Sequence, residues 1–534
     1  MASGGLRLIV QVHQDEVPDF GIFVDPPNPI IPGFNPDPSI TRAGDDYFLV
    51  TSSFEFFPGV PVYHSKDLIK WDLIGHALNR PSQLNMRGTA PSGDIISPPD
   101  NTTRMPRSFY VHSKDPFDDA SWSDPIYVDL PGFDPDIFVS NGTAHLTVTN
   151  GATQINPDAG YFSIFHTTLD LSTGNSLTDY DIFHISSLPQ GTPRLAEGSH
   201  LYQRNGFFYL LTAEAGTEVQ HRSMIKRART LQGPWEENPN NPILFNGRNM
   251  SNPVLSTGHA DLVSTLQGKW WIVFLATRPQ NPRNSIGVAQ LGRETFLAPV
   301  EWVDDWPVVN GGVVITEEMQ GLYDLQKPKV WRDEFRGGKL KDKAYYTPRT
   351  PYKVFHDFKA RPAWLRLKGN AYTLADRETP AVLMRKQTEY EVVFSTELDF
   401  QPTDKKHEAG VTVFLSIHFH NTVAVMLHPE TGKRCVVVRT RTGEDAAVKT
   451  GYYDIPEKGT VKLMIKAGRG GYELGFAAGG QKVRYVASVE NKWLQTALKG
   501  WQNFVGTHFG VYATGNGWPM RVPADFKYIQ TELL

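Results

Sequence analysis

Three acidic residues lie in local sequences that could place a carboxyl group for catalysis. Asp37 lies in PGFNPDPSI (residues 32–40), between two prolines and directly before a β-rich run. Asp134 lies in PGFDPDIF (131–138) and Glu197 in RLAEGSHLY (194–202), each also followed by such a run. Because proline fixes its own φ and restricts the preceding residue, we expect the Asp37 carboxylate on a stiff turn. Taken singly, an Asp-Pro pair more often begins a turn, and a lone Glu more often lies in a solvated loop.

A group of three carboxylates suits glycoside hydrolysis. One protonated acid delivers a proton to the leaving oxygen, while an ionised partner activates water or attacks the sugar. A third carboxylate raises the pKa of the acid by like-charge repulsion and keeps it protonated near neutral pH. The chain also has 12 Trp, 20 Tyr and 30 Phe, whose rings can pack against the apolar C–H faces of sugars. If the chain folds as a β-propeller, we expect the three residues at the starts of successive blades, where they converge on the central axis.

Short strands would have to position these residues. Runs such as YFLVTSS (47–53), FFYLLTA (207–213) and WWIVFLAT (270–277) alternate with Gly, Pro, Asn and Asp, and long helical periodicity is scarce. Many evenly spaced strands predict an all-β sandwich, barrel or propeller.

A loose internal repeat favours the propeller. YHSKDLIKW (63–71) is echoed by YVHSKDP (110–116) before Trp122, and by RARTL (227–231) before GPW (233–235). Trp71 and Trp122 lie 122 − 71 = 51 residues apart, near the length of about 40–50 residues typical of one blade. The alternative is a series of β-hairpins with aromatic ends.

A change in the residue pattern near residues 325–335 predicts a second domain. Beyond QKPKVW (326–331), charged and apolar residues alternate in strands such as YEVVFSTELDF (390–400). This alternation is typical of a sheet with one buried and one solvent-exposed face. A chain of 534 residues also exceeds one compact core. We predict an N-terminal extension over 1–27, a propeller over 28–325 and a smaller β-sandwich over 331–534.

Composition excludes several classes of protein. The chain has 53 basic and 57 acidic residues, a net charge of −4, which argues against a dedicated nucleic-acid binder. Its one cysteine, Cys435, excludes an intramolecular disulfide framework and a Cys-rich zinc site. No run reaches the roughly 18–20 apolar residues of a membrane span, and the N-terminus lacks the apolar region of a signal peptide. We expect no nucleic-acid or membrane partner and a cytoplasmic location; an incomplete N-terminal gene model would leave secretion open.

Several motifs in one order resemble glycoside hydrolase family 43. They are NPIIPGFNPDPSI, TSSFEFFPGVPVYHSKDLIKW, GFDPDIF, EGSHLYQRNGFFYLLTAEAGT, GHADLV and LGRETF. The match is similar to the branch of β-xylosidases and α-L-arabinofuranosidases with a C-terminal β-sandwich. The resemblance implies a five-bladed β-propeller, a concanavalin-like (lectin-like) sandwich and an inverting reaction, with acid and base roughly 6.5–9.5 Å apart.

The resemblance also implies a role for each matching residue. Asp37 corresponds to the general base, Glu197 to the general acid, and Asp134 to the carboxylate that raises the pKa of the acid and orients it. Arg293 in LGRETF resembles the arginine that binds sugar hydroxyls. Phe54 resembles the aromatic wall of the sugar pocket; ordinary core packing is the alternative. The family requires no cofactor, but His259 in GHADLV resembles a central histidine that in some members contacts a calcium ion or its water shell.

One stretch departs from the family pattern. Relatives carry a Trp-Ala-Pro segment soon after the NRPSQL stretch (79–84), and that Trp lines the pocket; here APSGDIISPP (90–99) follows instead. We therefore expect a propeller short by part of one blade near residues 90–100. This departure favours either a mis-spliced or mispredicted gene product or a naturally shortened homologue.

We expect an exo-acting hydrolase that releases xylose or arabinofuranose from xylo-oligosaccharide or arabinoxylan fragments. The sandwich would close one side of the pocket, with GTHFGVYATGN (506–516) contributing. The alternative is a catalytically impaired or non-catalytic sugar-binding homologue, which the lost Trp-Ala-Pro segment motivates. A retaining fructan-type hydrolase is a third option, but the motifs for its Asp nucleophile are missing from the sequence.

Overall fold

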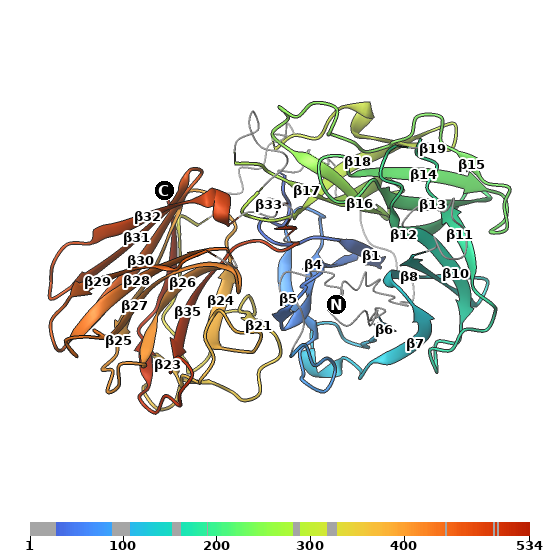
Figure 1. Ribbon diagram of the computed structural model, residues 1–534. Coiled ribbons are helices and arrows are strands. Elements are labelled where there is room, and N and C mark those ends of the chain that lie inside the picture. The colour runs from blue at the N-terminus through green and yellow to red at the C-terminus, as the bar shows by residue number, and fades with distance from the viewer. Residues whose placement is uncertain are drawn as a thin grey trace.

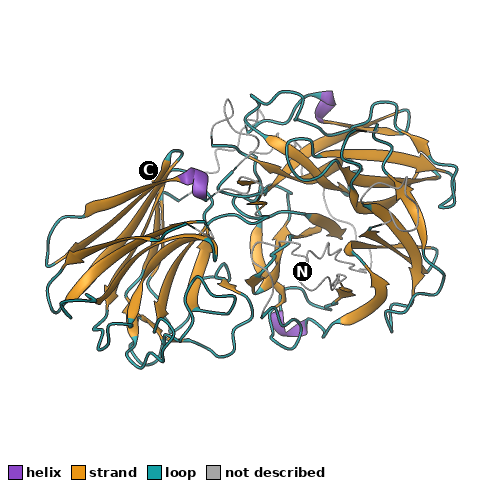
Figure 2. Ribbon diagram, viewed as in Figure 1, coloured by secondary structure: helices purple, strands orange, loops and turns teal. Residues whose placement is uncertain are grey.

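A ring of small sheets stands beside a two-layer β-sandwich (Figure 1). The computed structural model describes residues 28–87, 107–151, 162–189, 191–280, 289–317, 328–443, 446–494, 497–498, 501–502 and 504–534. Helical structure within these residues consists of the short turns η2 (Asp119–Ser121), η3 (Asn310–Gly312) and η4 (Asn491–Trp493) (Figure 2). In the described part of the chain, no helix is long and apolar enough to cross a membrane. The predicted fold class, a β-propeller followed by a β-sandwich, is confirmed.

The ring contains four antiparallel sheets of four strands, each formed by strands that follow one another in the chain. Blade I has β1 (Ser39–Ala43), β2 (Asp46–Val50), β4 (Gly59–Ser65) and β5 (Asp72–Leu78). Blade III has β8 (Phe133–Ser140), β9 (Thr143–Asn150), β10 (Ser163–Leu169) and β11 (Asp181–Ile185). Blade IV has β12 (Ala196–Arg204), β13 (Phe207–Glu214), β14 (Arg222–Ala228) and β15 (Glu236–Glu237). Blade V has β16 (Leu255–Ser264), β17 (Trp270–Thr277), β18 (Glu294–Val303) and β19 (Trp306–Val309).

Local sequence specifies the first hairpin of two blades. Asn141-Gly142 joins β8 to β9, and Asn205-Gly206 joins β12 to β13. All four residues have positive φ, between 49° and 78°. A two-residue turn with both central residues in this region matches the twist of its strands, and Asn-Gly is the preferred pair for it. The inner strands of blades III and IV are thus set by short-range signals.

Hydrogen bonds between the two ends of the propeller sequence close the ring. The amide of Asn28 donates to the carbonyl oxygen of Leu297 at 2.9 Å, and Ile31 pairs with Thr295 of β18. Asp261, a buried residue of β16, accepts hydrogen bonds from the Ile40 N–H at 2.9 Å and from the Ser39 hydroxyl of β1 at 3.1 Å. Its other oxygen accepts a 2.6 Å bond from the Tyr202 hydroxyl of β12. A single carboxyl group therefore links blades I, IV and V near the axis.

Blade II is described by β6 (Arg107–Tyr110) and β7 (Ile126–Pro131). The internal repeat identifies these strands. Residues 63–71 run from the third to the fourth strand of blade I, and their echo at 110–122 runs from β6 toward β7. The two strands therefore correspond to the outer pair of a blade. The missing inner part that the sequence predicts falls on residues 88–106, outside the described residues, and stays a prediction.

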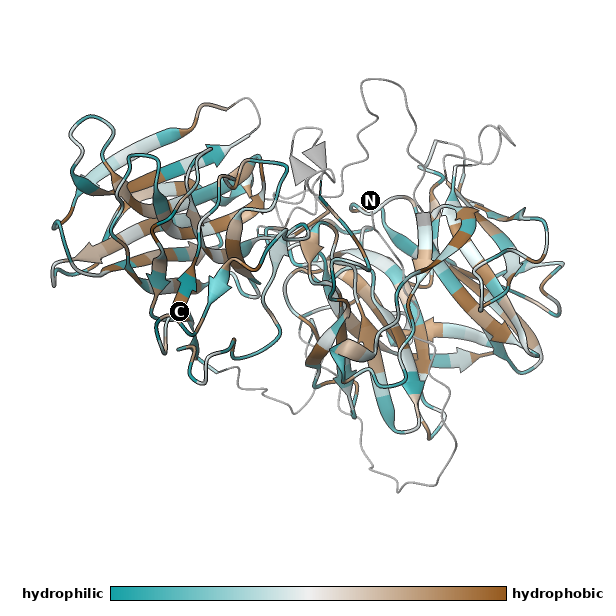
Figure 3. Ribbon diagram, turned by 90° about the horizontal axis from the view of Figure 1, so that it is seen from below, coloured by the Kyte–Doolittle hydropathy of each residue, from teal (hydrophilic) through white to brown (hydrophobic). Residues whose placement is uncertain are grey.

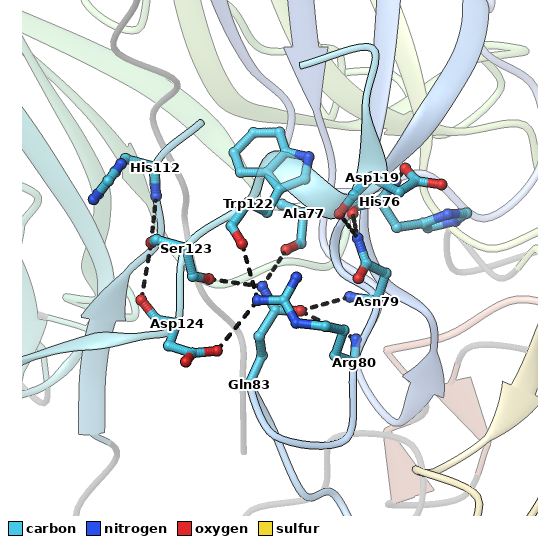
Figure 4. Close-up of polar contacts among 10 residues, drawn as sticks. All are labelled: His76, Ala77, Asn79, Arg80, Gln83, His112, Asp119, Trp122, Ser123 and Asp124. Carbon is cyan, nitrogen blue, oxygen red and sulfur yellow. Dashed lines mark hydrogen bonds and ion pairs between the residues drawn. The ribbon is translucent and has the colours of Figure 1, made fainter. Parts of the chain in front are cut away.

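The turn after β5 fastens blade II to blade I (Figure 4). The buried Gln83 amide donates to the carbonyl oxygens of Ala77 at 3.0 Å and Ser123 at 2.9 Å. Its oxygen accepts from the N–H groups of Asn79 at 3.0 Å and Arg80 at 3.1 Å. All the hydrogen-bonding capacity of this amide serves the junction, so the predicted NRPSQL motif has a structural role here.

The second domain is a sandwich of two antiparallel sheets. One sheet has β22 (His356–Asp357), β23 (Leu365–Leu367), β36 (Ala524–Phe526), β25 (Val392–Asp399), β30 (Val461–Gly468), β31 (Gly471–Ala478) and β32 (Arg484–Glu490) in this order. In the same sheet, β37 (Ile529–Leu533) pairs with β25, and β20 (Val330–Asp333) pairs with β37. The other has β24 (Ala381–Lys386), β35 (His508–Thr514), β26 (Glu408–Ser416), β27 (Phe419–Leu427), β28 (Arg434–Thr442) and β29 (Lys449–Asp454). Figure 3 shows hydrophobic and hydrophilic residues alternating along the strands, as expected where one face of a sheet is buried.

The two domains share one apolar core. Phe34, Phe54 and Phe56 of the propeller belong to the same buried cluster as the sandwich interior. In addition, β3 (Phe56–Phe57) pairs with β21 (Thr347–Pro348) across the junction. A second short pair, β33 (Ala497–Leu498) with β34 (Trp501–Gln502), precedes the segment that enters the site described below. This continuous core fixes the sandwich against the propeller.

Replacing Gln83 with Ala should lower the free energy of unfolding by about 2–4 kcal/mol, because several buried backbone groups lose their partners. Urea unfolding followed by fluorescence measures the change. Gln203→Ala removes an exposed amide from β12 and should alter stability by no more than about 0.5 kcal/mol. Equal effects of the two substitutions would contradict the role given to Gln83.

Candidate active site

Irregular positions in the inner strands carry the predicted site residues. Asp37 lies two residues before β1, Asp134 lies in β8, Glu197 in β12 and His259 in β16. The pairing of β8, β12 and β16 with the neighbouring strand shifts register at these residues. Bulges of this kind re-aim side chains and are frequent near active sites. The three carboxyl groups therefore come from blades I, III and IV, not from successive blades as the sequence suggested, because blade II lies between Asp37 and Asp134.

Left-handed backbone conformations recur at the same places. Asp37, Asp134 and His259 have φ of 53°, 48° and 47°. Such conformations cost about 1–3 kcal/mol each for residues other than glycine and persist only where the surroundings enforce them. Gly198, beside Glu197, also has positive φ, and a Cβ at this position would lie 2.5 Å from Nε2 of His259. The glycine permits the imidazole to pack directly against the backbone that carries Glu197.

Asp37 is the carboxylate of the site with the lowest pKa. Its Oδ1 lies 3.1 Å from Nη1 of Arg293 and 3.2 Å from Nδ1 of His259. Burial by itself opposes ionisation, but the positive charges of Arg293 and His259 and the hydrogen bond from His259 outweigh it. Together they hold the pKa of Asp37 well below its usual range.

The pKa of Glu197 is shifted in the opposite direction. Burial raises the pKa of its carboxyl group to about 8, with the negative charges of Asp134 and Asp37 adding to the effect and the positive charges of His259 and Arg293 opposing it. Burial, with the charge of Asp37, also raises the pKa of Asp134 to about 6. At neutral pH the site therefore holds one protonated acid beside two ionised carboxylates.

The imidazole of His259 carries a positive charge in this arrangement. Burial alone would lower its pKa, but the negative charges of Asp134 and Asp37 raise it to about 9. The contact of His259 with a calcium ion or its water shell, which the resemblance implied, stays a prediction. In the part of the chain that the structure describes, no group of three or more His, Cys, Asp or Glu side chains could hold a metal ion.

Arg293 connects the carboxylate to both domains. Besides Asp37, its Nη1 donates to Oγ1 of Thr217 at 3.2 Å, and its Nη2 donates to the carbonyl oxygen of Phe504 in the sandwich at 3.3 Å. The rings of Phe54 and Phe504 stack with centroids 5.8 Å apart and an interplanar angle of 12°. Both rings lie within 6 Å of the guanidinium carbon, at 5.4 and 5.6 Å. Phe54 thus faces the site as well as the core.

The structure brings together all six residues predicted from the sequence: Asp37, Phe54, Asp134, Glu197, His259 and Arg293. Sequence reasoning missed Thr217 and Phe504. Thr217 ends the quoted EAGT motif, so a signal for it was present. Phe504 lies two residues before the expected segment 506–516, most of which forms the ordinary sandwich strand β35.

A close approach of two glycines brings Phe504 to Arg293. Thr507 donates its N–H to the carbonyl oxygen of Gln290 at 2.9 Å. A Cβ on Gly506 would lie 2.2 Å from the carbonyl oxygen of Leu291, and one on Gly292 would lie 2.9 Å from Cα of Gly506. Only glycine allows the two backbones to meet here, and this contact carries the sandwich into the site.

Comparison with known proteins gives one consistent picture. A family model described as glycosyl hydrolases family 43 matches residues 26–307, and one described as the beta xylosidase C-terminal concanavalin A-like domain matches residues 332–532. The chain is 34% identical to a non-reducing end alpha-L-arabinofuranosidase of Bacteroides ovatus, covering 95% of this chain and 94% of that protein. It is 32% identical to a xylosidase/arabinosidase of Butyrivibrio fibrisolvens, covering 95% and 99%. The crystal structure of a xylan beta-1,4-xylosidase from Bacillus halodurans superimposes with a TM-score of 0.84 at 27% identity, covering 95% of this chain and 100% of that one.

The raised pKa of Glu197 predicts a specific effect of pH on stability. Between its ordinary value of 4.5 and about 8, the folded state binds a proton that the unfolded state has released, so stability falls as pH rises through this window. Glu197→Gln removes this contribution. The thermal midpoint of the variant should therefore rise relative to the parent between pH 5 and pH 8.5, as measured by calorimetry. Glu301→Gln, which changes an exposed side chain of β18, should show a constant difference, and a constant difference for Glu197→Gln would refute the raised pKa.

Proposed function

The chain belongs to glycosyl hydrolase family 43 and is an inverting glycoside hydrolase, and from this premise we propose that Asp37, Glu197 and Asp134 perform its reaction. The family relatives are β-xylosidases and α-L-arabinofuranosidases, and this chain has the same exo-acting activity, releasing xylose or arabinofuranose. The comparisons give no support to a non-catalytic sugar-binding protein. Xylo-oligosaccharides and arabinoxylan fragments are the substrates.

The opposite pKa shifts of Asp37 and Glu197 support the proposal most strongly. Asp37 stays ionised, so it can accept a proton from water as that water attacks the anomeric carbon. Glu197 stays protonated at neutral pH, so it can donate a proton to the departing glycosidic oxygen. Inversion follows because water, not the enzyme, makes the new bond on the face opposite the leaving group.

Three further residues would assist these two. The charge of Asp134 is the strongest of the charges that raise the pKa of Glu197, so Asp134 keeps the acid protonated. Arg293 fixes Asp37 and offers guanidinium N–H groups for sugar hydroxyls. His259 donates to Asp37 from a protonated ring and thus orients the base.

No cofactor is needed for these steps, because Asp37 accepts the proton that the attacking water loses and Glu197 supplies the proton that the leaving oxygen gains. The stacked pair of Phe54 and Phe504 offers an apolar wall next to Arg293. This pair would take the place of the pocket aromatic that the sequence lacks at the Trp-Ala-Pro position. A wall supplied by the sandwich favours a pocket that admits only chain ends.

Hydrolysis of 4-nitrophenyl β-D-xyloside and 4-nitrophenyl α-L-arabinofuranoside tests the assignment. Asp37→Asn and Glu197→Gln should each lower kcat/KM by about 10²–10⁴-fold, the usual contribution of a general base or acid. Glu301→Gln, on the outer part of blade V, should keep the activity of the parent. Proton NMR of the first product should show α-xylose from the β-xyloside. Retention of configuration would disprove the role of Asp37, and turnover of Glu197→Gln equal to the parent would disprove that of Glu197.

The pH profile tests the role of Asp134. The kcat/KM of the parent should decline above about pH 8, where Glu197 loses its proton. In Asp134→Asn the repulsion between the two carboxyl groups is lost, so the alkaline limb should move to lower pH. Kinetics from pH 5 to pH 10 with the aryl glycoside that is hydrolysed faster measure this. An alkaline limb that stays in place would assign Asp134 to orientation alone.

A further inference from the structure

Lys386, the last residue of β24, extends from the sandwich to the propeller. Its Nζ donates a 2.7 Å hydrogen bond to Oδ1 of Asn35. The ring centroids of Tyr346 and Phe34 lie 4.9 and 5.6 Å from the same nitrogen. Among the described residues, no carboxylate forms an ion pair with it. The polar end of this side chain is therefore committed to a single residue of the other domain.

The surroundings make this an unusual place for a cationic side chain. Burial lowers the pKa of Lys386 to about 7. Burial, together with the charge of Lys386, also lowers the pKa values of His76 and His508 to about 3. Both histidines are therefore neutral at physiological pH and add no second positive charge beside Lys386. An ammonium held without a counter-ion costs free energy, and packing alone would be served as well by an apolar chain of the same length.

Asn35 begins the turn that carries Asp37. Its N–H donates to the carbonyl oxygen of Arg293 at 2.9 Å, and its own carbonyl oxygen accepts from the Thr295 hydroxyl at 2.7 Å. Its side-chain oxygen accepts the Lys386 bond, a 2.7 Å bond from the Tyr63 hydroxyl and a longer 3.4 Å bond from the Thr51 hydroxyl. The two short bonds come one from each domain, and Lys386 is the donor from the sandwich that helps to fix the orientation of the Asn35 amide.

The conformation of Asp37 depends on this turn. Two residues after Asn35, Asp37 has φ of 53°, a region that non-glycine residues occupy only when held there. The propeller supplies the backbone bonds of the turn, whereas Lys386 is the donor that the sandwich supplies to it. A displacement of about 1 Å in a reacting group can cost about 10²-fold in rate, so small movements of this turn matter.

We propose that Lys386 is a positioning residue, through which the sandwich fixes the Asn35 turn and aims the Asp37 carboxylate. This inference rests on the base role of Asp37 given above. It makes the second domain part of the control of kcat, beyond its contribution of Phe504 to the pocket wall. Both the ammonium and the neutral amine can donate to Asn35, so the effect does not depend on the protonation of Lys386.

Lys386→Met tests the proposal, because methionine keeps the apolar packing against Tyr346 and Phe34 and removes the donor. We expect kcat to fall about 10–100-fold, with KM little changed, because the sugar contacts stay in place. The fall should be equal for aryl xylosides with good and poor leaving groups, since the defect lies in the attack of water. Lys386→Arg keeps a donor and should recover part of the lost kcat.

Lys343→Met is the matched control. Lys343 also extends from the sandwich to the propeller, 2.8 Å from Asp119, but contacts neither Asn35 nor Asp37. It should keep the kcat of the parent. Circular dichroism melts verify folding of each variant, and Lys386→Gln, whose shorter amide does not reach Asn35, replaces Lys386→Met if that variant does not fold.

Several outcomes would overturn the inference. One is a Lys386→Met enzyme that keeps the kcat of the parent, and another is an equal loss of kcat in Lys343→Met. A third is a change in KM alone. The last is a loss of kcat confined to substrates with poor leaving groups, which is the pattern expected for a damaged general acid. A parent enzyme inactive on every aryl glycoside would instead overturn the proposed function, and this inference with it.

Discussion

Three carboxyl groups share one largely buried site, and they cannot all be charged there at neutral pH. Arg293 and His259 supply two positive charges, which balance the negative charges of Asp37 and Asp134. Among the residues that the structure describes, no third cation balances a charge on Glu197, so its proton stays in place. The division between base and acid thus follows from charge balance in a medium that screens poorly. Both cations lie against Asp37, which explains why this residue, and not Glu197, is the ionised partner.

Keeping such charges together places demands on the backbone. The inner strands β8, β12 and β16 lose regular pairing at the functional positions, and Asp37, Asp134 and His259 adopt left-handed conformations. These local costs are offset by a stable frame: the four-stranded blades, the Asp261 contacts that close the ring, and the core shared with the sandwich. The described part of blade II is held by the Gln83 turn and contributes none of the site residues. A family member can therefore depart from the usual sequence in this blade while the carboxyl groups of the other blades keep their positions.

The sandwich completes the site from outside the ring. Phe504 gives its carbonyl oxygen to Arg293 and its ring to Phe54, and Lys386 contacts the turn before Asp37. All these contacts depend on the close backbone approach of Gly292 and Gly506 and on the pairing of β3 with β21. The interface between the domains is thus also the boundary of the pocket. The access of substrate to the site therefore depends on how the sandwich packs against the propeller.

Much of this protein could be predicted from the sequence. The all-β class, the propeller, the later sandwich and the three carboxylates follow from local signals: turn residues, alternating strands, the aromatic repeat, and acidic residues in stiff settings. Arg293, Phe54 and His259 were identified only through the resemblance to glycoside hydrolase family 43. Asn141-Gly142 and Asn205-Gly206 specify their hairpins without help from the rest of the chain. The blades that carry the carboxyl groups, and the contributions of Thr217, Phe504 and Lys386, were not predictable in this way. They depend on contacts between residues as far apart as Asn35 and Lys386. Residue types and strands are therefore set by the sequence over short range. The protonation of Glu197 and the ionisation of Asp37 are set only in the folded molecule, because burial and the distances between charges exist only there.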